Sequence, residues 1–136
     1  MVALEIWYDQ DTANDLGEGD PAIIVATPDE LDAFVDRVLE ETKAHSAPPM
    51  IEVSVAGNPS SPAMHVGLGQ ERGFIYYMAA DGGWTQGDQS REDVVTYVYV
   101  GSASEIAGNT EVPLADVRRG LREFMATGGR PTIIRP

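Results

Sequence analysis

The succession of short apolar segments and helical segments is the feature that most limits how this chain can fold. Six segments are rich in Val, Ile and Tyr and are bounded by turn residues, which is the pattern of β-strands. They are residues 2–8, 22–26, 50–55, 63–68, 74–78 and 94–100. Several connections between them have hairpin length, which predicts a mostly antiparallel sheet.

Two other segments repeat apolar residues at helical spacing. The first opens with a capping box, Thr27-Pro28-Asp29-Glu30, in which Thr27 is the N-cap and the Glu30 side chain folds back toward the backbone amides at the start of the helix. This helix is expected to run to about His45, before Pro48-Pro49 stops it. The second helix begins near Pro113 and is ended by Gly128-Gly129.

Gly120 lies inside the second helix at a cost of about 1 kcal/mol relative to Ala, which indicates close packing there. A short terminal strand is also expected at residues 132–134. The sequence therefore predicts a single α+β domain over residues 1–136. It consists of a mostly antiparallel sheet of about six strands with two helices packed on one face.

The composition excludes several classes of function. The 136 residues include 22 Asp and Glu, 9 Lys and Arg and no Cys, for a net charge of -13. Without Cys the chain has no disulfide scaffold, thiolate metal site or cysteine nucleophile. The acidity argues against binding to nucleic acid or to an anionic membrane, since both need Lys and Arg, and it favours a basic protein partner.

Neither an export signal nor a membrane anchor is recognisable. The N-terminal apolar residues follow no basic region, and Glu5 interrupts them. The longest apolar run, residues 74–80, is far shorter than the roughly 20 residues of a membrane-spanning helix. A cytoplasmic protein is therefore expected.

The charge is distributed unevenly along the chain. Residues 1–60 contain 13 acidic and two basic residues, whereas residues 113–136 contain two acidic and five basic residues. This asymmetry predicts that the acidity is concentrated on one side of the molecule and faces a basic partner.

Asp9, Asp11 and Asp15 resemble the start of a calcium-binding loop. Such a loop requires Asp or Asn at its fifth position and Gly at its sixth, where this chain has Ala13 and Asn14. The segment is therefore expected to be a solvated acidic loop that can serve as a contact surface.

His45 and His65 are the two histidines of the chain. A zinc site would need further ligands at suitable spacing, and a serine nucleophile would need an activating context; neither is visible. No metal, cofactor or catalytic residue is expected, and the chain is expected not to be an enzyme. A general-base role for His65 stays open as an alternative.

A glycine-punctuated loop at residues 81–90 is a candidate contact site because it carries Trp84 and Asp88. A tryptophan between acidic residues is typical of an interface anchor. The alternative is that Trp84 covers the edge of the core.

A second candidate site is the strand with Tyr97 and Tyr99 and the loop after it, which carries Glu105. Alternation places the two tyrosines on one face of the strand and Val98 on the other. The tyrosines either cover the sheet or form a surface for a partner.

The chain resembles the Imm one family of immunity proteins from bacterial polymorphic toxin systems. The resemblance is carried by residues 97–136, by the segment 19–38 and by the loop with Trp84. The matching motifs in the C-terminal third are Glu111-Val112-Pro113, Phe124, Thr127-Gly128 and Arg130-Pro131. The C-terminus departs from the family, because it ends Ile133-Ile134-Arg135-Pro136 where relatives continue to an aromatic residue.

The resemblance implies a non-catalytic inhibitor that binds the C-terminal domain of one cognate toxin, in many cases a nucleic-acid deaminase. We expect acidic and aromatic contacts to block the toxin's substrate groove or active site. The candidate contact residues are Trp84, Asp88, Tyr97, Tyr99, Glu105, Asp9 and Asp11. The alternatives are a small-molecule-binding module or minor enzyme that uses the sheet face and His65, and a general acidic DNA mimic.

Overall fold

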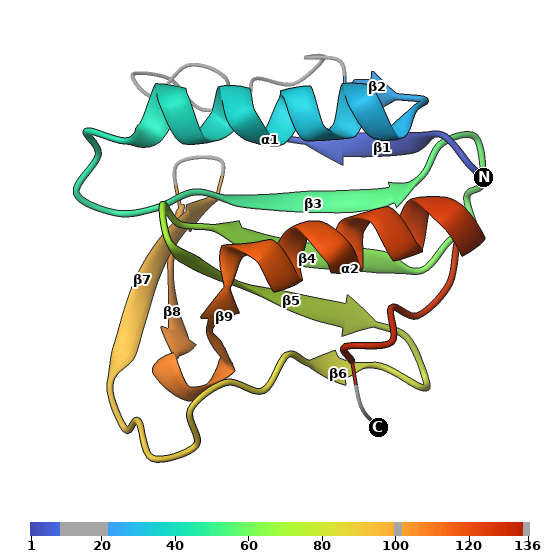
Figure 1. Ribbon diagram of the computed structural model, residues 1–136. Coiled ribbons are helices and arrows are strands. Elements are labelled where there is room, and N and C mark those ends of the chain that lie inside the picture. The colour runs from blue at the N-terminus through green and yellow to red at the C-terminus, as the bar shows by residue number, and fades with distance from the viewer. Residues whose placement is uncertain (9–21, 100–101, 135–136) are drawn as a thin grey trace.

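Figure 1 shows the elements in this computed structural model, which describes residues 1–8, 22–99 and 102–134. The helices are α1 (Pro28–Thr42) and α2 (Leu114–Thr127), with a 3₁₀ turn, η1, at Gly108–Thr110. The strands are β1 (Leu4–Trp7), β2 (Ile23–Val25), β3 (Met50–Val55), β4 (Ala63–Leu68), β5 (Arg72–Met78), β6 (Gly83–Trp84), β7 (Val94–Tyr99), β8 (Ser102–Ala107) and β9 (Val112–Pro113).

Seven of these strands form one antiparallel sheet in the order β2-β1-β3-β4-β5-β6, with β9 paired to β5. Because side chains alternate along a strand, each strand presents one set of residues to each face. On β1, Leu4 and Ile6 are buried in the main core, whereas Glu5 and Trp7 lie on the opposite face.

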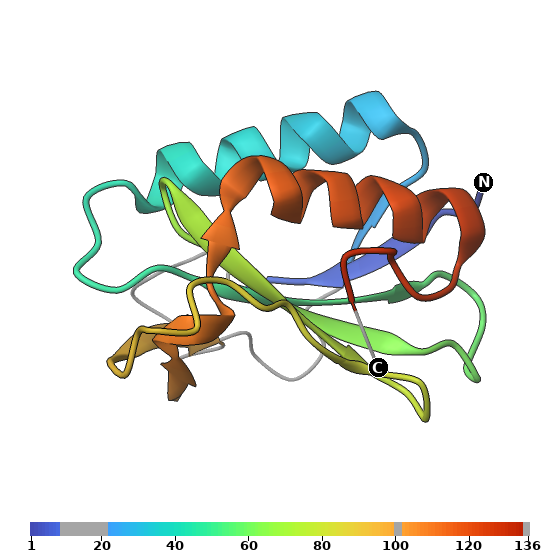
Figure 2. The same ribbon diagram turned by 60° about the horizontal axis from the view of Figure 1, so that its bottom comes forward.

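The main core lies between the sheet and the two helices, which cover the same face (Figure 2). The helices bury Leu31, Phe34, Val35, Val38, Val117, Leu121, Phe124 and Met125 in it. The predicted α+β class, with an antiparallel sheet and both helices on one face, is confirmed. Within the described residues, no helix is long and apolar enough to cross a membrane.

The predicted capping box forms at the start of α1. The Thr27 hydroxyl accepts a hydrogen bond from the Glu30 amide (3.1 Å), and the Glu30 carboxylate accepts one from the Ala26 amide (2.8 Å). The helix ends at Thr42, before the predicted end at about His45. The His45 amide donates to the Thr42 carbonyl (3.0 Å), which is a tighter turn than the helical i to i−4 pattern allows.

Gly128 ends α2 as predicted. It has φ of 72°, a left-handed conformation that glycine adopts without strain, and its amide donates to the Phe124 carbonyl (2.7 Å). Close packing at Gly120 is also confirmed, because a Cβ atom there would lie 2.5 Å from the Ile75 Cδ1 atom.

The predicted strand at residues 132–134 is wrong. The Ile134 amide donates to the Pro131 carbonyl (3.1 Å), so the chain turns there. The Thr132 hydroxyl donates to the Glu123 carboxylate (2.6 Å to Oε2), which ties this turn to α2.

Strands β7 and β8 form a separate antiparallel ribbon, which differs from the sequence prediction in two ways. Residues 94–100 were expected to join the main sheet, and residues 101–106 were expected to be a loop. Instead the ribbon packs across one end of the sheet face that the helices leave open (Figure 2). Tyr97 and Ile106 of the ribbon pack there against Met50 and Phe74 of the sheet, and these four residues form a second, smaller core.

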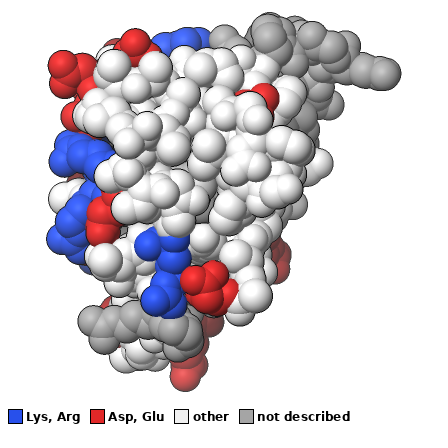
Figure 3. Space-filling view, turned by 90° about the vertical axis from the view of Figure 1, so that its right-hand side faces the viewer, with Lys and Arg blue, Asp and Glu red and all other residues white. Residues whose placement is uncertain are grey.

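The charge asymmetry of the sequence is partly cancelled in the fold because α1 and α2 lie side by side. Arg118 binds Asp36 (Nη2–Oδ1 2.6 Å) and Arg122 binds Asp32 (Nη2–Oδ1 3.1 Å), so basic residues near one terminus neutralise acidic residues near the other. On the end of the molecule seen in Figure 3, basic and acidic side chains gather together along the left edge.

Candidate functional site

A row of large polar and aromatic side chains crosses the sheet face opposite the helices. In the sheet register, Trp7 is paired with Glu52, Glu52 with His65, His65 with Tyr76 and Tyr76 with Trp84. The row therefore runs across five neighbouring strands, and its members are half-buried apart from Trp84, which is exposed. Aromatic residues are enriched at protein interfaces, so the part of this face that the ribbon leaves open is a candidate contact surface.

Trp84 is held by aromatic neighbours and also reaches solvent. Its ring stacks on Tyr76, with centroids 4.2 Å apart and planes within 8°, and its centroid lies 5.7 Å from that of Phe74. The side chain is 36% exposed. Trp84 thus covers the edge of the second core and keeps part of its ring exposed to solvent.

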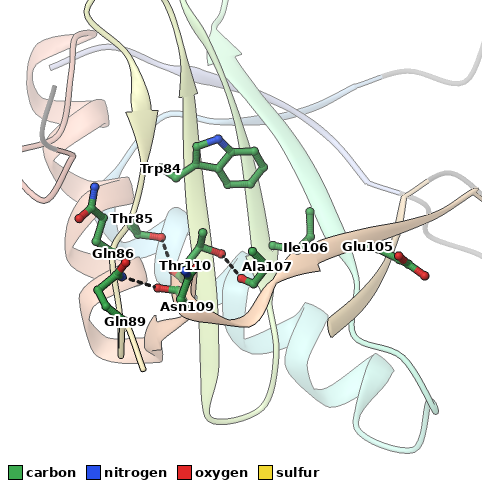
Figure 4. Close-up of a pocket in the computed structure, with 9 residues that line it drawn as sticks. All are labelled: Trp84, Thr85, Gln86, Gln89, Glu105, Ile106, Ala107, Asn109 and Thr110. Carbon is green, nitrogen blue, oxygen red and sulfur yellow. Dashed lines mark hydrogen bonds between the residues drawn. The ribbon is translucent and has the colours of Figure 1, made fainter. Parts of the chain in front are cut away.

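A pocket of about 360 Å³ lies between Trp84 and the end of β8 (Figure 4). Trp84 and Ile106 lie on two sides of it, and Glu105 lies at its outer rim with its carboxylate directed away from Trp84. The structure thus brings together two of the residues that the sequence singled out. Asn109 and Gln89 add amide groups, and the Gln89 amide donates to the Asn109 carbonyl (3.0 Å).

Thr85 fixes the floor of this pocket, and sequence reasoning missed it. The fully buried hydroxyl accepts a hydrogen bond from the Ile75 amide (3.1 Å) and donates one to the Thr110 carbonyl (2.7 Å). It therefore joins β5 to the turn after β8. A single Thr in a glycine-rich loop gives no sequence signal for this role.

The ribbon is attached to the sheet through Glu111, a buried carboxylate that the sequence identified only as part of a motif. It accepts a hydrogen bond from the Tyr97 hydroxyl and one from Arg91 (Nη1–Oε1 3.0 Å). Arg91 also binds Asp93 (Nη2–Oδ2 2.7 Å) at the start of the ribbon. Burial, and secondarily the Glu111 carboxylate, raises the pKa of the Tyr97 hydroxyl well above its usual value.

The two tyrosines of β7 have different surroundings. Tyr97 is completely buried in the second core, so it positions the ribbon and would have to leave the core to contact a partner. Tyr99 is half-buried, with its ring centroid 5.9 Å from that of His65. Burial and the nearby charge of Glu52 raise the pKa of the Tyr99 hydroxyl.

The remaining candidate residues lie away from the pocket lining or outside the described residues. Asp88 is exposed, and its carboxylate accepts hydrogen bonds from the Ser90 hydroxyl (2.6 Å) and amide (3.0 Å), which lower the Asp88 pKa. Asp9 and Asp11 fall outside the residues that the structure describes.

The histidines show no arrangement that would bind a metal ion. His65 lies 3.2 Å from Glu52 (Nε2–Oε1), and His45 is exposed in the turn after α1. Across residues 1–8, 22–99 and 102–134, no three His, Asp or Glu side chains gather as a metal site requires.

Comparison with known proteins places the chain in a family. The family model described as Immunity protein Imm1 matches residues 19–136, which include the pocket, the ribbon and Glu111. A comparison with curated proteins gave no match.

Proposed function

This chain belongs to the Imm1 family of immunity proteins, and on that premise we propose that it protects its cell by binding and inhibiting one cognate toxin of a polymorphic toxin system. The target we propose is a basic, nucleic-acid-acting C-terminal toxin domain, specifically a deaminase. Such a toxin acts on nucleic acid inside the cell, so we expect the inhibitor in the cytoplasm.

The mechanism we propose is occlusion of the substrate groove. A deaminase that acts on DNA or RNA needs a basic groove around its zinc pocket to hold phosphates. A protein with a net charge of -13 is attracted to such a groove and competes with the nucleic acid there. Inhibition then requires binding alone, without catalysis by this chain.

The pocket between Trp84 and the end of β8 supports this proposal most directly, because it has an aromatic anchor in its lining and the exposed Glu105 at its rim. Tyr99 and Asp88 extend the contact surface in our proposal, and Asp9 and Asp11 remain predicted contacts. An interface of about 1,600 Å² would suffice for tight binding if a few such anchors are well buried.

The test is inhibition of the toxin domain encoded next to this protein's gene. Purified wild-type chain should bind that domain and abolish its activity, and it should not inhibit close variants of the toxin as strongly. A general DNA mimic would instead inhibit unrelated basic proteins as well. A wild-type chain that neither binds nor inhibits the domain would overturn the proposed function.

The contact residues are tested separately. The triple variant Trp84→Ala, Asp88→Asn, Glu105→Gln should lose protection in cells that express the toxin. The matched control is the double variant Asp29→Asn, Glu71→Gln. It removes one exposed charge from the first turn of α1 and one from the β4–β5 turn, and it should protect fully. A folded triple variant that still protects would refute the site and leave the function standing.

A further inference from the structure

Strand β8 carries backbone hydrogen-bonding groups that β7 does not use. In an antiparallel pair, residues opposite each other alternate between exchanging hydrogen bonds and pointing their amide and carbonyl groups away. The Val98 amide donates to the Pro48 carbonyl (3.0 Å), on the side of β7 away from β8. Its partner in the register, Ala103, therefore points its amide and carbonyl to the outer edge of β8.

The same alternation gives the direction of the backbone amide and carbonyl groups in the rest of β8. Glu105 and Ala107 share the orientation of Ala103, whereas Ser104 and Ile106 face β7. The Ala107 carbonyl accepts a hydrogen bond from the Thr110 hydroxyl (2.7 Å), on the side away from β7. The backbone groups of Ala103 and Glu105 have no partner strand among the described residues.

This edge has little of the usual protection against pairing. Natural sheets block exposed edges with charged side chains, Lys above all, with Pro, with bulges or with very short strands. β8 is six residues long, its register to β7 is unbroken, it contains no Lys or Pro, and Glu105 is its single charged residue. The outer strands of the main sheet, β2 and β6, have only three and two residues.

The pocket beside Trp84 lies against this free edge. Glu105, Ile106 and Ala107 all line it, although consecutive residues of a strand point to opposite faces. A pocket that touches three consecutive residues lies at the edge of the strand, and the other edge of β8 is occupied by β7. A strand added to β8 would therefore pass Trp84.

We propose that an extended segment of the toxin pairs with β8 as an added strand and places a side chain against Trp84. This inference rests on the proposed function and names its binding mode. Glu105 is exposed on the free edge, so a Lys or Arg of the toxin segment belongs beside it. A second copy of this chain fits less well, because it would bring another charge of -13 and a second Glu105 to the same edge.

Amide hydrogen exchange, measured by NMR on the free chain and on its complex with the toxin domain, tests this pairing directly. The Ala103 and Glu105 amides should exchange at least about tenfold more slowly in the complex, while Ser104 and Ile106 are already protected by β7. If the complex forms and inhibits but the Ala103 and Glu105 amides are unaffected, strand addition is refuted and the proposed function survives.

A matched pair of variants provides a second readout. Ala103→Pro removes an outward amide without removing a hydrogen bond to β7, and should weaken toxin binding about tenfold or more. Ala103→Thr keeps that amide and should change the dissociation constant less than threefold. Equal affinities for the two variants would overturn the proposal, as would a concentration-dependent dimer whose formation protects the same amides in the chain without toxin.

Discussion

At the scale of single residues, the second core depends on one buried carboxylate. Glu111 is 6% exposed and receives hydrogen bonds from a neutral and a charged donor, Tyr97 and Arg91. Buried charges are tolerated when they are paired in this way. Sequence reasoning recognised Glu111 as part of a motif, but the hydroxyl and the guanidinium that satisfy it lie 14 and 20 residues earlier in the chain, beyond the reach of a local pattern.

Substitution of this pair should reveal strong coupling. Glu111→Ala leaves the Tyr97 hydroxyl and Arg91 without their acceptor and should lower the free energy of unfolding by about 3 kcal/mol. Tyr97→Phe should cost about 1–2 kcal/mol. Urea denaturation of both single variants and the double variant measures the coupling; strictly additive losses would contradict the hydrogen-bonded pair.

Local rules of the sequence placed the helices and several strands correctly. The capping box at Thr27 and the glycine stop at Gly128 depend on neighbouring residues alone, so the sequence contains the necessary information. β8 could not be recognised in the same way. Its Ser and Ala residues have little preference for strands, and it is a strand because β7 pairs with it.

The position of β7 illustrates a second limit. Alternation correctly separated Tyr97 from Val98, but it could not say which face meets the sheet. The tyrosine face does so because Gly67 leaves room for the Tyr97 ring and Phe74 packs against it, with ring centroids 4.9 Å apart. This space is created by three segments together, and no local pattern reports it.

At the scale of elements, Gly67 is therefore expected to control how the ribbon docks. A Cβ atom at this position would lie 2.6 Å from the Tyr97 ring and closer still to the Phe74 ring, both buried. Gly67→Ala should lower the free energy of unfolding by about 1–3 kcal/mol. Thermal or chemical denaturation measures the loss.

The control is Gly129→Ala. A Cβ atom there would meet only the Thr127 hydroxyl oxygen, at 3.8 Å, so the stability should change by less than about 0.5 kcal/mol. Equal effects of the two substitutions would show that docking of the ribbon does not limit the size of residue 67.

At the scale of the whole molecule, the net charge of -13 is compatible with local neutralisation between α1 and α2. Arg118 and Arg122 of α2 lie beside Asp36 and Asp32 of α1, so positive and negative charges offset each other on the helix side. Acidic side chains also lie away from the helices: Glu52 is on the helix-free face and Glu105 is at the pocket rim.

Toxin binding should therefore be sensitive to salt in a specific way. Raising the ionic strength from about 50 to about 500 mM should lower the association rate constant about tenfold or more and change the dissociation rate constant little. Stopped-flow or surface-based kinetics measures both constants. An association rate independent of salt would rule out electrostatic steering by the acidic surface.

The two separate cores have a consequence for how such a protein can change its target. The main core under the helices supplies most of the buried apolar residues, while the ribbon is attached through a smaller core and Glu111. Ala103 and Glu105 are exposed and belong to neither core. In the binding mode proposed above, a few mutations at the ribbon edge would therefore retarget the protein without a compensating change in the scaffold beneath it.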